Sequence, residues 1–171
     1  DLSFAKIERT ILDAIAASDD RVVIHQALQH LVVGGNALIF MSKQGLKLYP
    51  LNRYVIERDG NGNVIEIITK ERINKELVEK YKEPQNILTV TESEDPNDKE
   101  IDVYTHVKRE NNRFVWHQEV RGKVLPDSKS KAPVDATPWL PLRFNTVDGE
   151  AYGRGRVGQF IGDLKSLEAL S

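Results

Sequence analysis

The amino-acid sequence predicts an α+β fold in a single domain over residues 1–171. Two observations carry this prediction. Apolar residues recur at helical spacing near both ends of the chain, and apolar and polar residues alternate with a period of two through its middle. We therefore expect a pair of helices over residues 1–35, a mixed, largely antiparallel sheet built from hairpins over residues 36–150, and a C-terminal helix over residues 151–171.

The composition is typical of a globular protein with one hydrophobic core. Hydrophobic residues make up 40% of the 171 residues and charged residues 29%, which disfavours a disordered or fibrous chain. The chain has no cysteine, so disulfides, thiolate metal sites and cysteine nucleophiles are excluded. Lys and Arg total 24 against 26 Asp and Glu, and a net charge of −2 disfavours a protein whose task is to grip the phosphates of nucleic acid.

The apolar runs and the chain ends bear on membranes and on processing. The longest apolar runs, Leu31–Val33 and Ala37–Met41, are far shorter than the ~20 residues that span a bilayer, so no membrane partner is expected. The chain starts at Asp1 without a methionine and stops at Ser171 within a helical pattern. We expect both ends to have been cut from something longer.

Two amphipathic helices are expected near the N-terminus. Apolar positions at steps of three and four residues mark the first helix, at Phe4, Ile7, Ile11 and Ile15, and the second, at Ile24, Ala27, Leu28 and Leu31. The short polar side chains of residues 18–20 are suited to cap the second helix. Gly34 and Gly35 are suited to end it, because glycine readily takes the left-handed conformation that closes a helix.

The middle of the chain predicts strands joined by turns. The expected strands are Ala37–Met41, Leu46–Tyr49, Tyr54–Arg58, Val64–Thr69, Ile101–Val107, Phe114–Val120 and Trp139–Phe144. Residues 59–63 are expected to turn the first hairpin and residues 111–112 the second. Because proline has no N–H to donate, Pro141 should confine the last strand to a sheet edge.

The remaining segments are a short helix, two loops and the final helix. A short helix capped by Asn74 is expected to run through Tyr81, with Glu76 in its first turn. Loops are expected near residues 84–100, which are acidic and interrupted by proline, and near residues 121–138, which are rich in Pro, Lys, Asp and Ser. The final helix is marked by Val157, Phe160, Ile161, Leu164 and Leu167.

The segment Gly153–Gly158 has the letters of a dinucleotide-binding fingerprint. That fingerprint follows a buried strand and precedes an acidic residue about 20 positions on, and neither is present here. We favour a glycine-rich turn where another subunit's backbone packs closely. A nucleotide-binding enzyme that uses Gly153–Gly158 is the alternative function.

No metal site, cofactor or catalytic residue is predicted. Residues 59–63 resemble the start of a calcium loop, but Val64 and Lys70 stand where that loop needs glycine and glutamate. His25 and His30 lie on different helix faces. His106 and His117 are expected opposite each other in the second hairpin, where packing is the favoured interpretation and a metal pair the alternative. No serine stands in a nucleophile-elbow context.

The start of the C-terminal helix supplies the candidate residues for contact between subunits. These candidates are Tyr152, Gly153, Arg154, Arg156 and Lys165. The three cations suit a salt bridge with a neighbouring chain or a phosphate contact. We favour a subunit contact or a solvated surface role over phosphate contact, because three charges in an acidic chain supply little affinity for DNA. A small DNA-binding adaptor is a third hypothesis.

Four stretches, in this order and spacing, resemble the portal, or head-to-tail connector, proteins of short-tailed bacteriophages. They are Ala27–Leu38, Leu46–Thr69 with its Arg58–Val64 turn, Ile101–His106, and Asp148–Gly153 running into Ile161–Glu168. Together they cover most of the chain, and the last is the most specific.

The resemblance implies a structural protein without catalysis or cofactor. It implies a ring, commonly of twelve subunits, at one capsid vertex of the virion, assembled in the host cytoplasm. Double-stranded DNA would enter and leave through the ring, which would dock the packaging ATPase (terminase), the tail and scaffold protein. The chain would correspond to the outer wing of the subunit, with residues 152–171 entering the stem.

Overall fold

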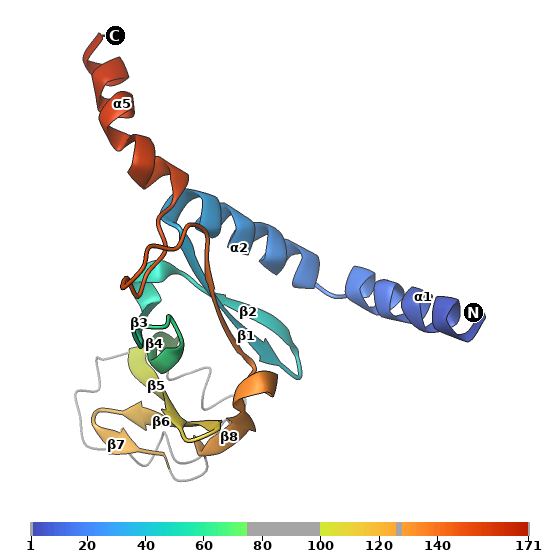
Figure 1. Cartoon of the computed structure of the whole chain (residues 1–171). Helices are drawn as coiled ribbons and strands as arrows, with labels where there is room; N and C mark the ends of the chain where they lie inside the picture. The colour runs from blue at the N-terminus through green and yellow to red at the C-terminus, as the bar shows by residue number, and fades with distance from the viewer. Residues whose placement is uncertain (1, 75–99, 126–127, 171) are drawn as a thin grey trace. The chain divides into compact units, whose positions relative to one another are not determined.

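The α+β class is confirmed by the computed structural model, which describes residues 2–74, 100–125 and 128–170 (Figure 1). The chain divides into two compact units, one of residues 1–51 with 138–171 and the other of residues 52–137. The prediction of a single domain stays a prediction.

The first unit combines helices with a small antiparallel sheet. Its helices are α1 (Leu2–Ala17), α2 (Asp20–Gly34) and α5 (Arg156–Leu170), and its strands are β1 (Asn36–Ser42), β2 (Gly45–Tyr49) and β9 (Trp139–Arg143). The strand order is β2-β1-β9. The proline-bearing strand β9 therefore lies at an edge of the described sheet, as predicted.

Both faces of this sheet carry apolar side chains. On one face Ala37 and Ile39 form a buried cluster with Ala27 of α2, and Leu31, Leu46, Leu48 and Leu140 pack against it. On the other face the Trp139 ring lies 4.3 Å from the Phe40 ring and 6.1 Å from the Tyr49 ring, centroid to centroid. The continuous apolar run in β1 is explained by this burial on both sides.

The second unit is a sheet of antiparallel hairpins. Its strands are β3 (Tyr54–Arg58), β4 (Val64–Asn74), β5 (Glu100–Glu110), β6 (Arg113–Val120), β7 (Lys123–Val124) and β8 (Ser130–Pro133). A 3₁₀ turn lies at Val134–Ala136, and another, Leu51–Arg53, spans the boundary between the two units along the chain. The order is β3-β4-β5-β6-β7, and β8 also pairs with β6. Both predicted hairpins are confirmed.

Alternation along β5 shows how this sheet divides into an apolar and a polar face. Ile101, Val103, Thr105 and Val107 are buried, and the residues between them are partly or fully exposed. Since neighbouring side chains of a strand point to opposite faces, the intervening residues Asp102, Tyr104, His106 and Lys108 share the polar face. We call this surface the polar sheet face.

The turn at residues 59–63 is organised by an aspartate. The Asp59 carboxylate accepts hydrogen bonds from the backbone N–H of Asn61 at 3.0 Å and of Asn63 at 2.7 Å, and from the Asn63 side chain at 2.9 Å. The Asn63 side-chain bond is the main cause that lowers the pKa of Asp59. The carboxylate thus stabilises the hairpin turn, which is the interpretation that the sequence favoured over a calcium loop.

Residues 121–138 differ from the expected loop. They contain β7 and β8, and Leu125 is 2% exposed. Leu125 packs with Ile101, Val103 and Val120, and its N–H donates to the Gln118 carbonyl at 2.9 Å. The edge of β6 offers unpaired backbone groups, and pairing them outweighs the polar composition that predicted a loop.

Strand β4 continues beyond the predicted end at Thr69 to Asn74. Asn74, the expected cap of a short helix through Tyr81, is the last residue of this strand. The other residues of that helix lie outside the described part of the chain, so the helix stays a prediction. All but the last residue of the loop expected near residues 84–100 also lie outside the described part.

The start of α2 is tied to β2 by an aspartate. The expected cap is only partly present: Ser18 Oγ accepts from the Asp20 N–H at 3.4 Å, and Asp19 makes no side-chain cap bond. Asp20 Oδ1 instead accepts from the backbone N–H of Leu46 at 2.8 Å. Sequence spacing could not reveal this bond, because its partners are 26 residues apart.

We predict that Asp20→Ala lowers the free energy of unfolding by about 1.5–3 kcal/mol, the range for a hydrogen bond to a charged group. Asp19→Ala is the matched control, because it removes a neighbouring aspartate that makes no cap bond, and it should cost less than about 0.5 kcal/mol. Urea denaturation followed by circular dichroism measures both changes. Equal losses in the two variants would contradict the assigned role of Asp20.

Candidate functional site

Gly35 meets two glycines that are far from it in sequence, Gly153 and Gly155, where α5 begins. Gly35 closes α2 in the left-handed conformation, with φ of 79°. A Cβ on Gly153 would lie 2.6 Å from the Gly35 carbonyl oxygen, a Cβ on Gly155 would overlap the Val33 carbonyl, and a Cβ on Gly35 would overlap the backbone between residues 154 and 155. We call Gly35, Gly153 and Gly155 the glycine junction.

A buried asparagine holds the glycine junction together. Asn36 is 5% exposed, and its side-chain oxygen accepts from the Gly153 N–H at 2.6 Å. Its side-chain nitrogen donates to the carbonyls of Gly153 at 2.7 Å and Gly34 at 3.0 Å. The sequence analysis missed this residue. The available signal was a polar side chain placed between two glycines and an apolar run, where burial requires hydrogen-bond partners.

Backbone bonds complete the same region. The Phe144 N–H donates to the Gly35 carbonyl at 2.9 Å, and the Arg154 N–H donates to the Asn145 carbonyl at 2.8 Å. The end of α2, the end of β9 and the start of α5 are therefore joined at one place, from which α5 rises in Figure 1.

The glycine junction changes the interpretation of Gly153–Gly158. The close backbone approach was expected from another subunit, but the end of α2 in the same chain makes it. A dinucleotide fingerprint uses its glycines to admit a pyrophosphate. Here the chain's own backbone lies against Gly153 and Gly155, which disfavours the nucleotide-binding alternative.

The three candidate cations have different surroundings. Arg154 pairs with Glu150 through contacts of 2.6 and 3.2 Å, and this pairing lowers the pKa of Glu150 and raises that of Arg154. The Arg156 guanidinium lies 5.9 Å from the centre of the Phe144 ring. Lys165 is exposed on α5. Arg154 thus already has a partner within the chain, whereas Lys165 extends into solvent.

The Glu150–Arg154 pair has a defined pH dependence. Because the pKa of Glu150 is lower in the folded chain, the pair favours folding above the ordinary carboxylate pKa. This contribution is lost as the pH falls through the lowered value. The pair is exposed, so its share of stability is small.

Of the other two interface candidates, Gly153 belongs to the glycine junction and Tyr152 directly precedes it. Tyr152 is half-buried and Gly153 is buried. Their proposed contact with a neighbouring subunit stays a prediction.

The apolar stripes of the helices are largely exposed. We call these surfaces the apolar helix faces: Phe4, Ile7, Ile11 and Leu12 on α1, Val22, Ile24, Leu28, Val32 and Val33 on α2, and Val157, Phe160, Ile161, Leu167 and Leu170 on α5. Exposure reaches 76% at Phe4 and 85% at Leu170. The predicted helices are confirmed, and on α1 and α5 the described residues of the stripe that normally faces a core are exposed. On α2 the stripe is divided: Ala27 and Leu31 pack against the sheet, whereas Ile24 and Leu28 are exposed. None of the described helices has the length and apolarity needed to cross a membrane.

The histidines are placed as the sequence predicted. His106 and His117 are direct cross-strand partners, with ring centroids 5.3 Å apart. His25 and His30 remain apart on α2, where His25 contacts Gln29. Glu119 was not identified from the sequence. Its carboxylate oxygen lies within hydrogen-bond distance of His117 Nε2. A spacing of two along a predicted strand was the signal that places both on one face.

Comparison with known proteins gives a consistent result. The family model described as bacteriophage head to tail connecting protein matches residues 2–171. Curated relatives include the portal proteins of Enterobacteria phage T3 and Escherichia phage T7, each 34% identical over 99% of this chain and 33% of the relative. The portal protein of Pseudomonas phage phiKMV is 27% identical over 99% of the chain and 34% of the relative. The chain spans about a third of the length of these relatives.

We predict that Gly35→Ala destabilises the chain by about 2–5 kcal/mol. A left-handed non-glycine residue costs about 1–2 kcal/mol, and overpacking against the 153–155 backbone adds about 1–3 kcal/mol. Thermal or urea unfolding measures this loss.

Gly34→Ala is the matched control for this substitution. Within the described part of the chain, no atom lies within 4 Å of a Cβ at Gly34, and alanine favours a helix over glycine by up to about 1 kcal/mol. This variant should be neutral or slightly stabilised. A Gly35→Ala variant as stable as Gly34→Ala would contradict the glycine junction.

Proposed function

Because this chain belongs to the bacteriophage head-to-tail connecting protein family, we propose that it is a non-enzymatic structural part of a portal ring. The ring lies at one capsid vertex of the virion after assembly in the host cytoplasm. It forms the conduit for DNA packaging and ejection and docks the packaging ATPase, the tail and scaffold protein. The ring contains twelve subunits, the number that the resemblance implies.

The observation that carries this proposal is the exposure of the apolar helix faces. Monomeric proteins rarely expose contiguous apolar patches above a few hundred Å², and larger patches mark interaction surfaces. Phe160 and Ile161 are 48% and 50% exposed next to each other on α5. Burying such side chains against another protein surface is favourable, because it removes apolar area from water.

A closed ring also requires two different surfaces on every subunit. Each subunit meets its two neighbours head to tail, so the patch that it offers to one neighbour differs from the patch that it offers to the other. The apolar faces of α1 and α5 are two such patches on separate helices of the first unit. We therefore assign them to contacts between copies of the protein.

The charge of the chain supports a conduit over a DNA-gripping protein. Each phosphate that a protein neutralises strengthens its hold on DNA, and a channel must let DNA slide. The net charge is −2, and Arg154 is already paired with Glu150. These features disfavour the DNA-binding adaptor.

The first prediction concerns assembly. Phe160→Ser with Ile161→Ser should shift the protein, expressed from its complete reading frame, from rings to smaller species. Burying one such side chain contributes about 1.5–3 kcal/mol, so the concentration at which rings dissociate should rise at least about tenfold. Native mass spectrometry and negative-stain electron microscopy measure the change.

Gln159→Ser with Asp163→Ser is the control for assembly, because it changes exposed polar residues of the same helix. Rings should persist in this variant. Absence of rings in the unsubstituted protein would refute the proposed function. Rings that survive both double substitutions equally would refute the role of the α5 face.

The second prediction concerns DNA. The chain should not bind double-stranded DNA at about 50 mM salt when the protein concentration is below about 100 μM. The reason is that a net-acidic protein neutralises few phosphates and so releases few counterions. Arg156→Ala with Lys165→Ala should leave this result unchanged. DNA affinity that falls steeply with salt would favour the adaptor, provided that the slope of log affinity against log salt is reduced by about two in the double variant.

A further inference from the structure

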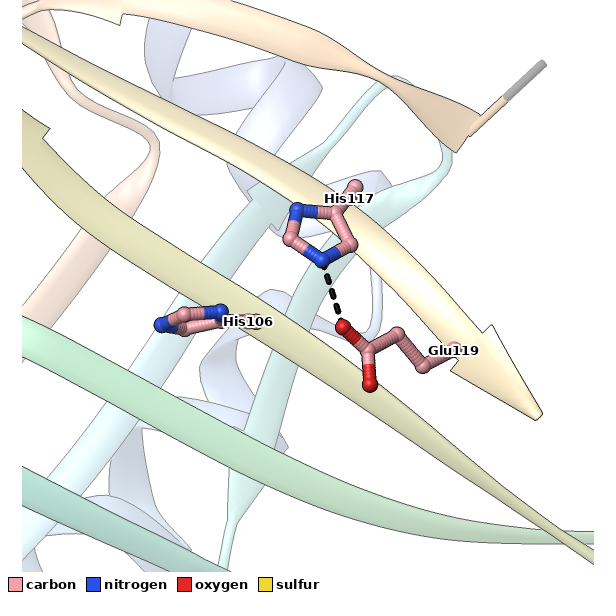
Figure 2. Close-up of side chains that lie close together, drawn as sticks. All are labelled: His106, His117 and Glu119. Atoms are coloured by element: carbon pink, nitrogen blue, oxygen red, sulfur yellow. Dashed lines mark hydrogen bonds and ion pairs between the residues drawn. The ribbon is translucent and has the colours of Figure 1, made fainter. Parts of the chain in front are cut away.

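We propose that His106, His117 and Glu119 bind a divalent transition metal ion, best matched by zinc, on the polar sheet face of the second unit. Figure 2 shows the three side chains gathered on one side of β5 and β6. This site lies on a different unit from the glycine junction and the apolar helix faces. It adds a ligand to a chain for which the sequence predicted none.

The strand register brings the ligand atoms together. His106 pairs directly with His117 across β5 and β6, and Glu119 follows His117 by two residues and so shares its face. One ligand atom from each of the three residues lies within 4.8 Å of the other two. The ligand atoms of a tetrahedral zinc ion lie about 3.3 Å apart, from metal–nitrogen bonds of about 2.0–2.1 Å. Small side-chain rotations on fixed strands close the difference.

His117 and Glu119 already converge on a single point. His117 Nε2 lies 2.7 Å from Glu119 Oε1. A metal ion that enters between these two atoms replaces a proton with a stronger positive charge. The same pair therefore supplies one nitrogen and one oxygen ligand without a change of backbone.

A second carboxylate orients the other histidine. His106 Nε2 contacts Glu66 Oε1 from β4, which leaves Nδ1 of the same ring for the metal. Histidines that bind metals usually donate their other ring N–H to a carboxylate, which fixes the tautomer and raises the basicity of the ligand. Glu66 is thus a positioning residue of this site, and packing of the two rings alone gives it no role.

The ligand set favours zinc over calcium or magnesium. Two imidazoles and one carboxylate match zinc sites that keep an open fourth position, whereas calcium and magnesium prefer oxygen ligands throughout. The side chains of His106, His117 and Glu119 are 28%, 27% and 34% exposed. A metal ion can therefore reach them from solvent, and water can fill the fourth position.

The surrounding charges are compatible with a dication. Glu66 and Glu119 together offset two positive charges when both imidazoles are neutral. On the same face Lys70 is paired with Asp102 at 2.7 Å. Arg72 is paired with Asp102 at 3.2 Å and with Glu100 at 3.5 Å. Lys70 and Arg72 are therefore neutralised locally and oppose metal binding only weakly. Lys108, directly opposite Glu66 in the register of β4 and β5, is a further cation on this face.

The test is a titration of the whole chain with zinc chloride by isothermal calorimetry and with cobalt chloride by visible absorption. We expect one ion per chain and a zinc-dependent rise in the melting temperature. His117→Gln should weaken zinc binding at least about tenfold. His25→Gln with His30→Gln is the matched control, because it removes two histidines outside the cluster, and it should leave binding unchanged.

Two carboxylate variants test the same proposal if the histidine variant fails to fold. Glu119→Gln keeps the side-chain shape and should also weaken binding at least about tenfold, and Glu66→Gln should weaken it about 10–100-fold. Circular dichroism verifies that each variant is folded. No zinc binding by the unsubstituted chain, or equal binding by the chain and all cluster variants, overturns the proposal.

Discussion

The close contact between the end of α2 and residues 153–155 is the constraint on which the first unit depends. Gly35, Gly153 and Gly155 leave no space for a side chain, and Asn36 satisfies the backbone groups that this contact buries. Since α5 begins at Arg156, directly after the contact, the glycine junction determines where that helix starts. The apolar face of α5 is thereby held at a fixed place on the unit.

The sequence predicted the fold where local periodicity carries the information. Alternation placed β5 and β6 and their register around the turn at Asn111, which takes a positive φ of 54°. Periodicity reports which face of an element is apolar, but not which distant backbone approaches it. The partners of Gly153 and Asp20 were missed for this reason. Leu125 was missed because a single buried leucine leaves no periodic pattern in a polar segment.

The two units expose different kinds of surface. In the first unit the helices are amphipathic, yet residues such as Phe4 and Phe160 remain exposed, which is the property expected of a subunit completed by its neighbours. In the second unit the exposed face is polar, with ion pairs and the histidines on it. The cluster of His106, His117 and Glu119 could be predicted from sequence only in part. The two histidines follow from strand pairing, whereas Glu66 comes from a strand 40 residues before His106.

The most direct measurement of the central claim is an electron cryomicroscopy map of the assembled protein at side-chain resolution. We expect Phe160 and Ile161 of each copy to be buried against a neighbouring copy, while Gly35, Gly153 and Gly155 keep their contact within one chain. Rings in which the apolar helix faces remain in solvent would contradict it.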